Sequence, residues 1–317
     1  IPALTGQILA NMAEYGLILL ISSLFFETLA LMTPHNKGLL CAHLTAVLFG
    51  MTGILGALIQ AHPLFITFGR AAFACLCLYF AALFYKTHLS QHLNRTQLLK
   101  LLFSGTMLAI HWLTFFIAVK EGGVAMATLG FASFPAFITI LERFVLRDTV
   151  NLRSWLLVLV VMLGLFLVTP SLDLQNQNTG GLVWGIVSGF AFAALAVSNR
   201  TYGQDLDSVQ IAFWQNLIVA LLTLPFLLFI EIRMTASDWF WLAVLGSAST
   251  ALSHFLFVTS LQYINARTAG LIIALEPVYA ILVAWPLFNE VPTLKIIIGG
   301  LLIIGAAVFP NPKSQTH

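Results

Sequence analysis

Charged side chains are scarce in this chain, since Asp, Glu, Lys and Arg make up only 8% of its 317 residues. A soluble domain carries about 25% charged residues, because such side chains cover much of its water-facing surface. Here the few charges fall mostly in short gaps between apolar runs, and apolar residues account for 60% of the chain. This composition excludes a soluble domain.

The apolar runs have the length of membrane spans. A run of about 20 residues crosses a hydrocarbon core of about 30 Å, and its backbone must satisfy its own hydrogen bonds there, as a helix does. The sequence therefore predicts an all-α, polytopic integral membrane protein of about ten transmembrane helices. The predicted spans are 38–60, 63–85, 97–119, 122–146, 152–169, 180–199, 208–230, 237–261, 268–288 and 293–309.

Motifs of ATP-driven and catalytic proteins are also missing. The chain has no Gly-x-x-x-x-Gly-Lys phosphate loop, no Gly-x-Ser-x-Gly elbow and no His-x-x-Glu-His motif. Cys41, Cys75 and Cys77 lie inside apolar runs without metal-type spacing, and a net charge of +2 is too small to indicate nucleic acid. We therefore expect no catalytic residue, no metal, no cofactor and no nucleic-acid partner.

Residues 1–37 stand apart from the ten spans. Their apolar stretch, residues 15–26, covers only 12 residues between Glu14 and Glu27, which is short for a membrane span. A signal-peptide core, an interfacial helix and an eleventh span all fit this pattern. We treat residues 1–37 as an appended N-terminal helix and assign it no role.

The long polar connection at residues 170–179 divides the spans into two sets of five. A shift of 142 positions places the second set on the first and aligns Pro135 with Pro277 and Asp148 with Glu290. Because five is odd, the second set must enter the membrane from the opposite side. The sequence thus predicts two inverted five-helix repeats, residues 38–169 and 180–310.

Lysine and arginine predict the orientation, because they are enriched in short cytoplasmic loops. If the first span runs outward from the cytoplasm, ten of these residues lie on the inner side and three on the outer side. Both ends of the ten-span core should therefore be cytoplasmic, in the inner membrane. The inner set is Lys37, Lys86, Arg95, Lys100, Arg143, Arg147, Arg153, Arg200, Arg267 and Lys313, and the outer set is Lys120, Arg233 and Lys295.

A pattern of small, proline and acidic residues recurs in the two halves. The second half reads Leu275-Glu276-Pro277-Val278, then Asn289-Glu290 and Gly299-Gly300, while the first half has Pro135, Asp148 and Gly164, with Arg70 in the second span. Over residues 38–310 the chain resembles the drug/metabolite transporter superfamily, and within it the ten-span EamA-type permeases. The first half departs from the family pattern, since Phe134 stands where Glu276 does and Arg147-Asp148 replaces Gly-Glu.

This resemblance implies an exporter of amino acids or other small metabolites. It also implies a cavity built chiefly from the first, third, fourth, sixth, eighth and ninth spans. We expect such an exporter to work by alternating access. The alternatives to this function are a multidrug or nucleotide-sugar-type transporter of the same fold and, less favoured, an intramembrane enzyme. The expected partners are a small-molecule substrate and the lipid bilayer. Coupling to protons, and the choice between monomer and homodimer, stay open.

Ionisable side chains deep in a span cost about 2.5–3.5 kcal/mol each on insertion scales, so each is a candidate for function. Glu276 is the first, because Pro277 loosens the helix beside its carboxylate. One interpretation is a group that takes up protons or binds a substrate ammonium. The other is a structural carboxylate paired with Arg70.

Further candidates come from matching places in the third and eighth spans. His111 with Trp112, and His254 with Ser253, either contact the substrate or form one interhelical hydrogen bond each. His43 near the inner end of the first span is a further substrate-binding candidate. Arg70 in the second span and Gln215 in the seventh serve either structure or substrate.

Two backbone features complete the prediction. Pro135 and Pro277 are candidate hinges, because proline removes a helix hydrogen bond. Gly181, Gly185 and Gly189 recur every four residues along the sixth span, which is typical of a close helix-packing face in lipid.

Overall fold

The computed structural model of the protein describes residues 32–91, 93–147, 149–168, 176–200, 206–273, 275–289 and 291–308. The predictions for residues 1–31, for Asp148, Glu290 and Lys313, and for residues 170–175 lie outside this part of the chain, as does the side chain of Pro277. The chain divides into two units between Lys37 and Gly38, and the second unit contains all ten predicted spans.

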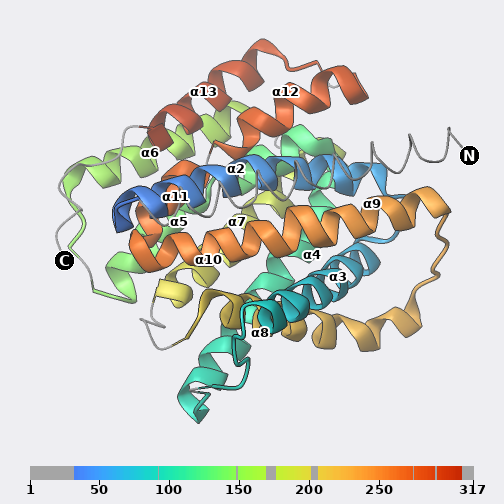
Figure 1. Cartoon of the computed structure of the whole chain (residues 1–317). Helices are drawn as coiled ribbons and strands as arrows, with labels where there is room; N and C mark the ends of the chain where they lie inside the picture. Colours follow the sequence, from blue (N-terminus) through green and yellow to red (C-terminus); the bar gives the residue numbers. More distant parts are fainter. Residues whose placement is uncertain are drawn as a thin grey trace, which may run out of the picture. The chain divides into compact units, whose positions relative to one another are not determined.

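Helices account for the secondary structure of the described residues, which contain no strand. In chain order they are α2 (Pro34–Leu58), α3 (Pro63–Phe84), α4 (Arg95–Phe131), α5 (Phe134–Phe144), α6 (Leu152–Val168), α7 (Gln177–Arg200), α8 (Ser208–Thr223), the 3-10 helix η1 (Leu224–Phe229), α9 (Ala236–Gly246), the π-helical turn η2 (Ser247–Leu252), α10 (Ser253–Tyr263), α11 (Ala266–Ile273), α12 (Glu276–Phe288) and α13 (Leu294–Val308). Figure 1 shows their course.

These helices form the ten spans that the sequence predicts. Six of the helical segments are long and apolar enough to cross a membrane by themselves. The 37-residue α4 carries the third span and the start of the fourth, because the backbone turns at Gly123 (φ 79°, ψ 173°), a conformation that favours glycine. The predicted class, an all-α polytopic membrane protein with two repeats, is confirmed.

The fourth and ninth spans are each broken, and at corresponding places. In the fourth span α4 ends at Phe131 and α5 begins at Phe134. In the ninth, α11 ends at Ile273 and α12 begins at Glu276, which is 142 positions after Phe134. A proline lies in the first turn of both α5 and α12, where its missing N–H leaves no helical hydrogen bond unmade.

Contacts between connections show that the repeats run in opposite directions. At one end, the Gln210 side chain in the first turn of α8 donates to the Leu89 carbonyl in the connection after α3, at 2.9 Å. At the other end, the Gln60 backbone N–H after α2 donates to Asp238 Oδ1 at the start of α9, at 2.7 Å. The connections after the first and the sixth span, which correspond in the two repeats, therefore lie at opposite ends.

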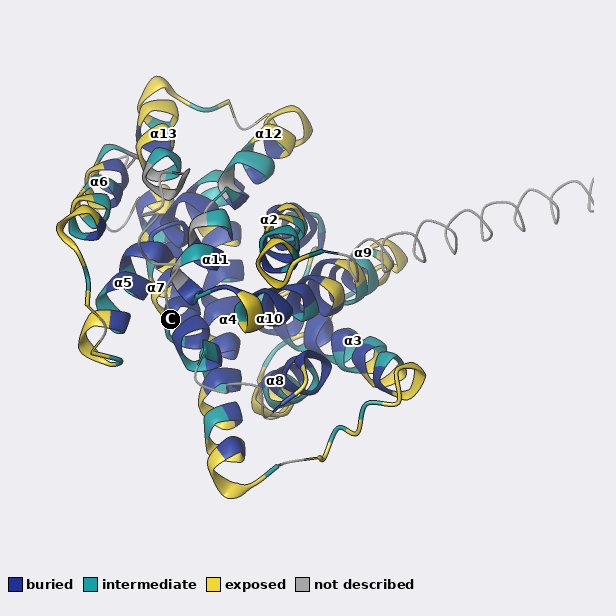
Figure 2. Cartoon of the chain, turned by 60° about the vertical axis from the view of Figure 1, so that its left-hand side comes forward, coloured by how far each residue is buried: buried dark blue, intermediate teal, exposed yellow. Residues whose placement is uncertain are grey.

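The buried centre of the fold is the contact between α4 and α7 (Figure 2). Gly181, Gly185 and Gly189 of α7 permit this contact, because a Cβ on each would lie 2.5–2.8 Å from the facing backbone. The facing backbone belongs to Gly122, Ala127 and Phe131. Any side chain at the three glycines would therefore force the two helices apart.

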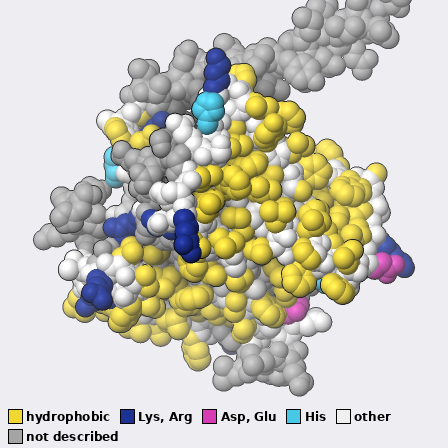
Figure 3. Space-filling view, turned by 90° about the horizontal axis from the view of Figure 1, so that it is seen from below, with side chains coloured by type: hydrophobic (Ala, Val, Ile, Leu, Met, Phe, Trp, Pro, Cys, Tyr) yellow, Lys and Arg dark blue, Asp and Glu magenta, His cyan; other side chains and the backbone are white. Residues whose placement is uncertain are grey.

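The periphery of the fold is apolar. The helices α6 and α13 pack side by side (Figure 1) and expose large hydrophobic side chains such as Phe166 and Leu301, as does η1 with Leu228 and Phe229. Figure 3 shows a broad hydrophobic face with its few charged side chains toward the margins. Lipid is the solvent that such a surface requires.

Candidate functional site

A small cavity of about 20 Å³ lies where α2, α3, α4 and α12 meet, so residues of both repeats line it. This volume holds about one water molecule. The cavity is lined by Phe49, Thr52, Arg70, His111, Trp112, Phe115, Phe131 and Glu276. Arg70, His111, Trp112 and Glu276 are thus the predicted site residues that the fold brings together.

Arg70 presents a buried positive charge to this cavity. Its side chain is 1% exposed, and the guanidinium carbon lies 4.0 Å from the centroid of the Trp112 ring. Its Nε donates to Thr250 Oγ1 at 2.9 Å, whereas its Nη1 has no hydrogen-bond partner among the described residues. The aromatic face and the hydroxyl fix the plane of the guanidinium and leave its terminal donor unpaired.

Glu276 presents the opposite charge. It is the first residue of α12, immediately after the break in the ninth span, and it is 3% exposed. A carboxylate is favoured at this position by the N-terminal end of the helix dipole. Glu276 and Arg70 line the same cavity, yet no ion pair within 4.0 Å joins them in the described part of the chain. The direct pairing of the structural interpretation is therefore not formed.

His111 lines the cavity and also forms the interhelical hydrogen bond considered for it. Its Nδ1 shares this hydrogen bond of 2.7 Å with Ser188 Oγ of α7. Its ring also stacks on Phe131, with centroids 5.0 Å apart. The side chain therefore lies on the cavity wall and at the same time links the first repeat to the second.

His254 and Gln215 belong to a second buried polar cluster, outside the cavity lining. His254 Nε2 shares a 2.8 Å hydrogen bond with Gln215 Oε1. The Gln215 amide donates to Ser104 Oγ at 2.7 Å and to Asn199 Oδ1 at 2.5 Å. These bonds join α4, α7, α8 and α10 and match the interhelical interpretation of both residues.

The same cluster meets the cavity wall along the pseudo-symmetry axis. The rings of Trp112 and His254 lie edge to face with centroids 6.4 Å apart, and these positions correspond under the 142-residue shift. Residues that correspond in two inverted repeats can contact each other only near the axis that relates the repeats. The cavity wall at Trp112 is therefore close to the centre of the molecule.

Two further candidates do not reach the cavity. The Ser253 hydroxyl donates to the Ser249 carbonyl of its own helical turn, at 2.6 Å. His43 is exposed on α2. Neither side chain is among those that line the cavity, and the prediction of substrate contacts gains no support for them from the geometry.

Sequence reasoning missed half of the lining. Phe49, Thr52, Phe115 and Phe131 carry no charge that would single them out among the many apolar residues of a span. A weak signal exists for Phe115, which lies one helical turn after His111 and so shares its face. The sixth and eighth spans, expected in the wall, lie behind it and supply the partners Ser188 and Thr250.

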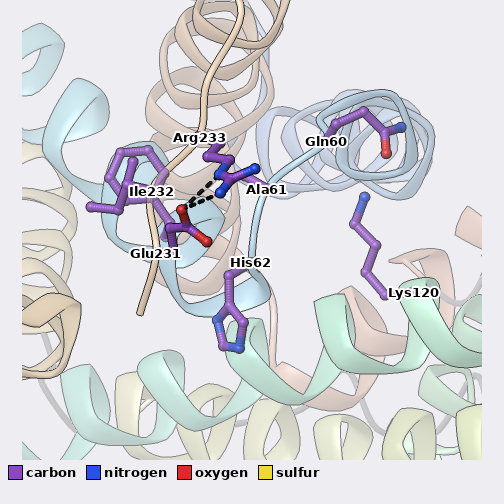
Figure 4. Close-up of a pocket in the computed structure, with 8 residues that line it drawn as sticks. Gln60, Ala61, His62, Lys120, Glu231, Ile232 and Arg233 are labelled. Atoms are coloured by element: carbon purple, nitrogen blue, oxygen red, sulfur yellow. Dashed lines mark hydrogen bonds and ion pairs between the residues drawn. The ribbon is translucent and has the colours of Figure 1, made fainter. Parts of the chain in front are cut away.

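A larger pocket of about 260 Å³ opens at one end of the bundle (Figure 4). It lies where the connections after the first, third and seventh spans meet, the end predicted to face outward. Its lining residues are Gln60, Ala61, His62, Phe65, Lys120, Glu231, Ile232 and Arg233. Glu231 and Arg233 pair with each other at 2.6 Å and are largely exposed, so their charges are screened by solvent.

Two inverted repeats around buried polar groups define a polytopic membrane transporter. Residues 36–169 and 179–310 each match the model of the EamA-like transporter family, and the chain belongs to this family. The predicted resemblance is confirmed, and the family is one of transporters rather than enzymes.

Similar proteins carry transporter names. An uncharacterized transporter of Archaeoglobus fulgidus is 27% identical over 196 residues, which are 62% of this chain and 70% of the relative. An S-adenosylmethionine uptake transporter of Rickettsia prowazekii is 25% identical over 187 residues, 59% of this chain and 62% of the relative. A solved structure named only "Crystal structure of protein" shares the fold, with a TM-score of 0.69 at 16% identity, over 86% of this chain and 96% of that one.

Proposed function

We propose that the chain is a secondary transporter of the cytoplasmic (inner) membrane that exports amino acids or related small metabolites. The observation that supports this best is the cavity lined by both repeats, where Arg70 and Glu276 present opposite charges without pairing. Buried charges are expensive unless something binds them. A small polar substrate suits them better than the apolar compounds of a multidrug transporter.

Alternating access is the proposed mechanism. The cavity has room for about one water molecule, so it must enlarge to admit a metabolite. The breaks before α5 and α12 lie at corresponding places in the two repeats, with Pro135 and Pro277 in the first turns of these helices. Bending at these two points would open the cavity toward one side and then the other, as in other inverted-repeat carriers.

The lining also supports a proposal for coupling. Glu276 faces the cavity, where a carboxylate that is alternately exposed to the two sides of the membrane can take up a proton on one side and release it on the other. We therefore assign proton coupling to Glu276.

S-adenosylmethionine is a second candidate substrate, because a relative is named as its uptake transporter. This molecule contains an amino-acid group, so it carries the same carboxylate and ammonium as the first class. The relative's name indicates uptake, whereas the EamA-type resemblance implies export. Direction must therefore be measured both ways.

Transport assays in cells that express or lack the protein test this function. We expect expressing cells to lose a preloaded amino acid faster than cells without the protein, within a panel of amino acids, S-adenosylmethionine and apolar drugs. Faster loss of the drugs alone would favour the multidrug alternative. Faster accumulation from the medium, with no effect on loss, would replace export by uptake.

A further inference from the structure

The eighth span contains a turn of π-helix at the level of the cavity. This turn, η2, spans Ser247–Leu252 between α9 and α10. Within it the Thr250 hydroxyl donates to the Leu245 carbonyl, five residues earlier, at 2.6 Å. A π-turn inside an α-helix is rare and recurs at functional sites, so the residues that contact this turn are candidates for a role in function.

The neighbour of the π-turn is Arg70 on α3. The Thr250 oxygen that donates to Leu245 also accepts the 2.9 Å hydrogen bond from Arg70 Nε. The two helices can approach closely here because Gly246, at the start of the turn, has no Cβ. A Cβ at this position would clash with Phe73 and approach the Arg70 carbonyl. The π-turn thus delivers one hydroxyl, in one position, to the guanidinium.

This contact occupies one edge of the guanidinium and leaves another free. Trp112 covers the guanidinium at 4.0 Å and Phe116 lies 5.3 Å from it. Nη1 is buried and has no partner among the described residues, although Arg70 lines the cavity. An unpaired buried donor on a charged group is costly, and an anionic ligand would remove that cost.

We infer that Arg70 binds the carboxylate of the transported metabolite and that Thr250, through the π-turn, is the residue that positions it. This inference rests on the proposed function and specifies its substrate class as a small α-amino acid. Arginine suits a carboxylate because its planar fork matches the two oxygens. Glu276 in the same cavity would take the adjacent ammonium and would repel the second charge of a phosphate.

The test measures selectivity for the carboxylate. The full chain is reconstituted in vesicles and given a mixture of labelled L-α-amino acids, the corresponding mixture of amino-acid amides, or a mixture of sugar phosphates. We expect transport of the acids and little transport of the amides or the phosphates. Arg70→Gln should abolish the preference for acids over amides, and Arg70→Lys, which keeps the charge without the fork, should weaken it.

Thr250 is tested with a matched pair and a control. Thr250→Val should reduce the acid-to-amide preference about tenfold, the usual effect of one lost hydrogen bond to a charged group. Thr250→Ser should restore it. Thr259→Val is the control. Like Thr250, Thr259 is buried in the eighth span, but its hydroxyl has no hydrogen-bond partner among the described residues, so this variant should keep the wild-type acid-to-amide preference.

The outcomes separate the inference from the proposed function. Equal transport of acids and amides by the wild-type chain, or a preference that survives both Arg70→Gln and Thr250→Val, overturns the carboxylate assignment and leaves the transporter in place. A preference for sugar phosphates also overturns it. Transport of none of the mixtures, with normal folding of the protein, overturns both.

Discussion

At the scale of single residues, Glu276 combines burial, a helix N-terminus and a place on the cavity wall. We expect Glu276→Gln to transport at a rate that no longer depends on pH, because the amide keeps the shape of the carboxylic acid but cannot release a proton. Flux into vesicles, measured with pH gradients of both signs, checks this expectation.

Glu231→Gln is the matched control, since that carboxylate is exposed and pairs with an exposed arginine at the outer pocket. It should keep the wild-type dependence on pH. A Glu276→Gln variant that follows the wild-type pH profile would show that the carboxylate does not carry the coupled proton.

The sequence indicates which residues of the site are charged but says little about their partners. Arg70, Glu276 and His111 were predictable because ionisable groups are rare and expensive in a span. Thr250 and Ser188 were not, because one small hydroxyl among many in apolar helices carries no distinguishing signal. The same rule also singles out His43, an ionisable residue near a span end that is exposed on α2 and does not line the cavity.

At the scale of helices, the contact between α4 and α7 depends on missing side chains. Gly185→Ala should destabilise the protein by about 1–3 kcal/mol, because its Cβ would lie 2.7 Å from the Ala127 carbonyl oxygen and backbone cannot move aside as a side chain does. Thermal unfolding in detergent measures the effect.

Gly305→Ala on α13 is the control for this substitution. A Cβ there meets nothing within 4 Å, so the variant should unfold at or above the wild-type temperature, given the higher helix propensity of alanine. Equal behaviour of the two variants would refute the packing argument.

Some helix breaks can be predicted from the sequence, whereas others cannot. Proline marks the breaks before α5 and α12, since its chemistry restricts where it can lie in a helix. The backbone turn between the third and fourth spans falls at Gly123, where a pair of glycines gives only a general hint. The π-turn in the eighth span contains neither proline nor an internal glycine, and its partner Arg70 lies on another helix, so the local sequence does not indicate it.

At the scale of the whole molecule, the inverted repeats predict which connections between helices face the same side of the membrane. In a chain whose three native cysteines are replaced, cysteines at Ser90 and Tyr263 should react with an impermeant thiol reagent from one side of the membrane. Cysteines at Asn178 and Ser237 should react from the other side, because these residues lie at the opposite end of the bundle. Intact cells and inverted vesicles distinguish the sides. Labelling of Ser90 and Ser237 positions from one side would rule out this topology.

The repeat was visible in the sequence because the prolines Pro135 and Pro277 and the acidic residues Asp148 and Glu290 obey one shift of 142 positions, and a polar connection divides the spans into two sets of five. The size of the cavity was not, because it depends on how aromatic rings such as Phe115 and Phe131 fill the space between helices. Ring packing is a property of three dimensions and has no linear pattern.

The volume of that cavity has an electrical consequence. A cell membrane maintains an electrical potential, and a continuous water-filled path across it would dissipate that potential. Beside Arg70 and Glu276 there is space for about one water molecule, so this arrangement leaves no room there for a wide water-filled channel. Each transport cycle would therefore carry a single metabolite molecule across, and the protein would not conduct as an open channel does.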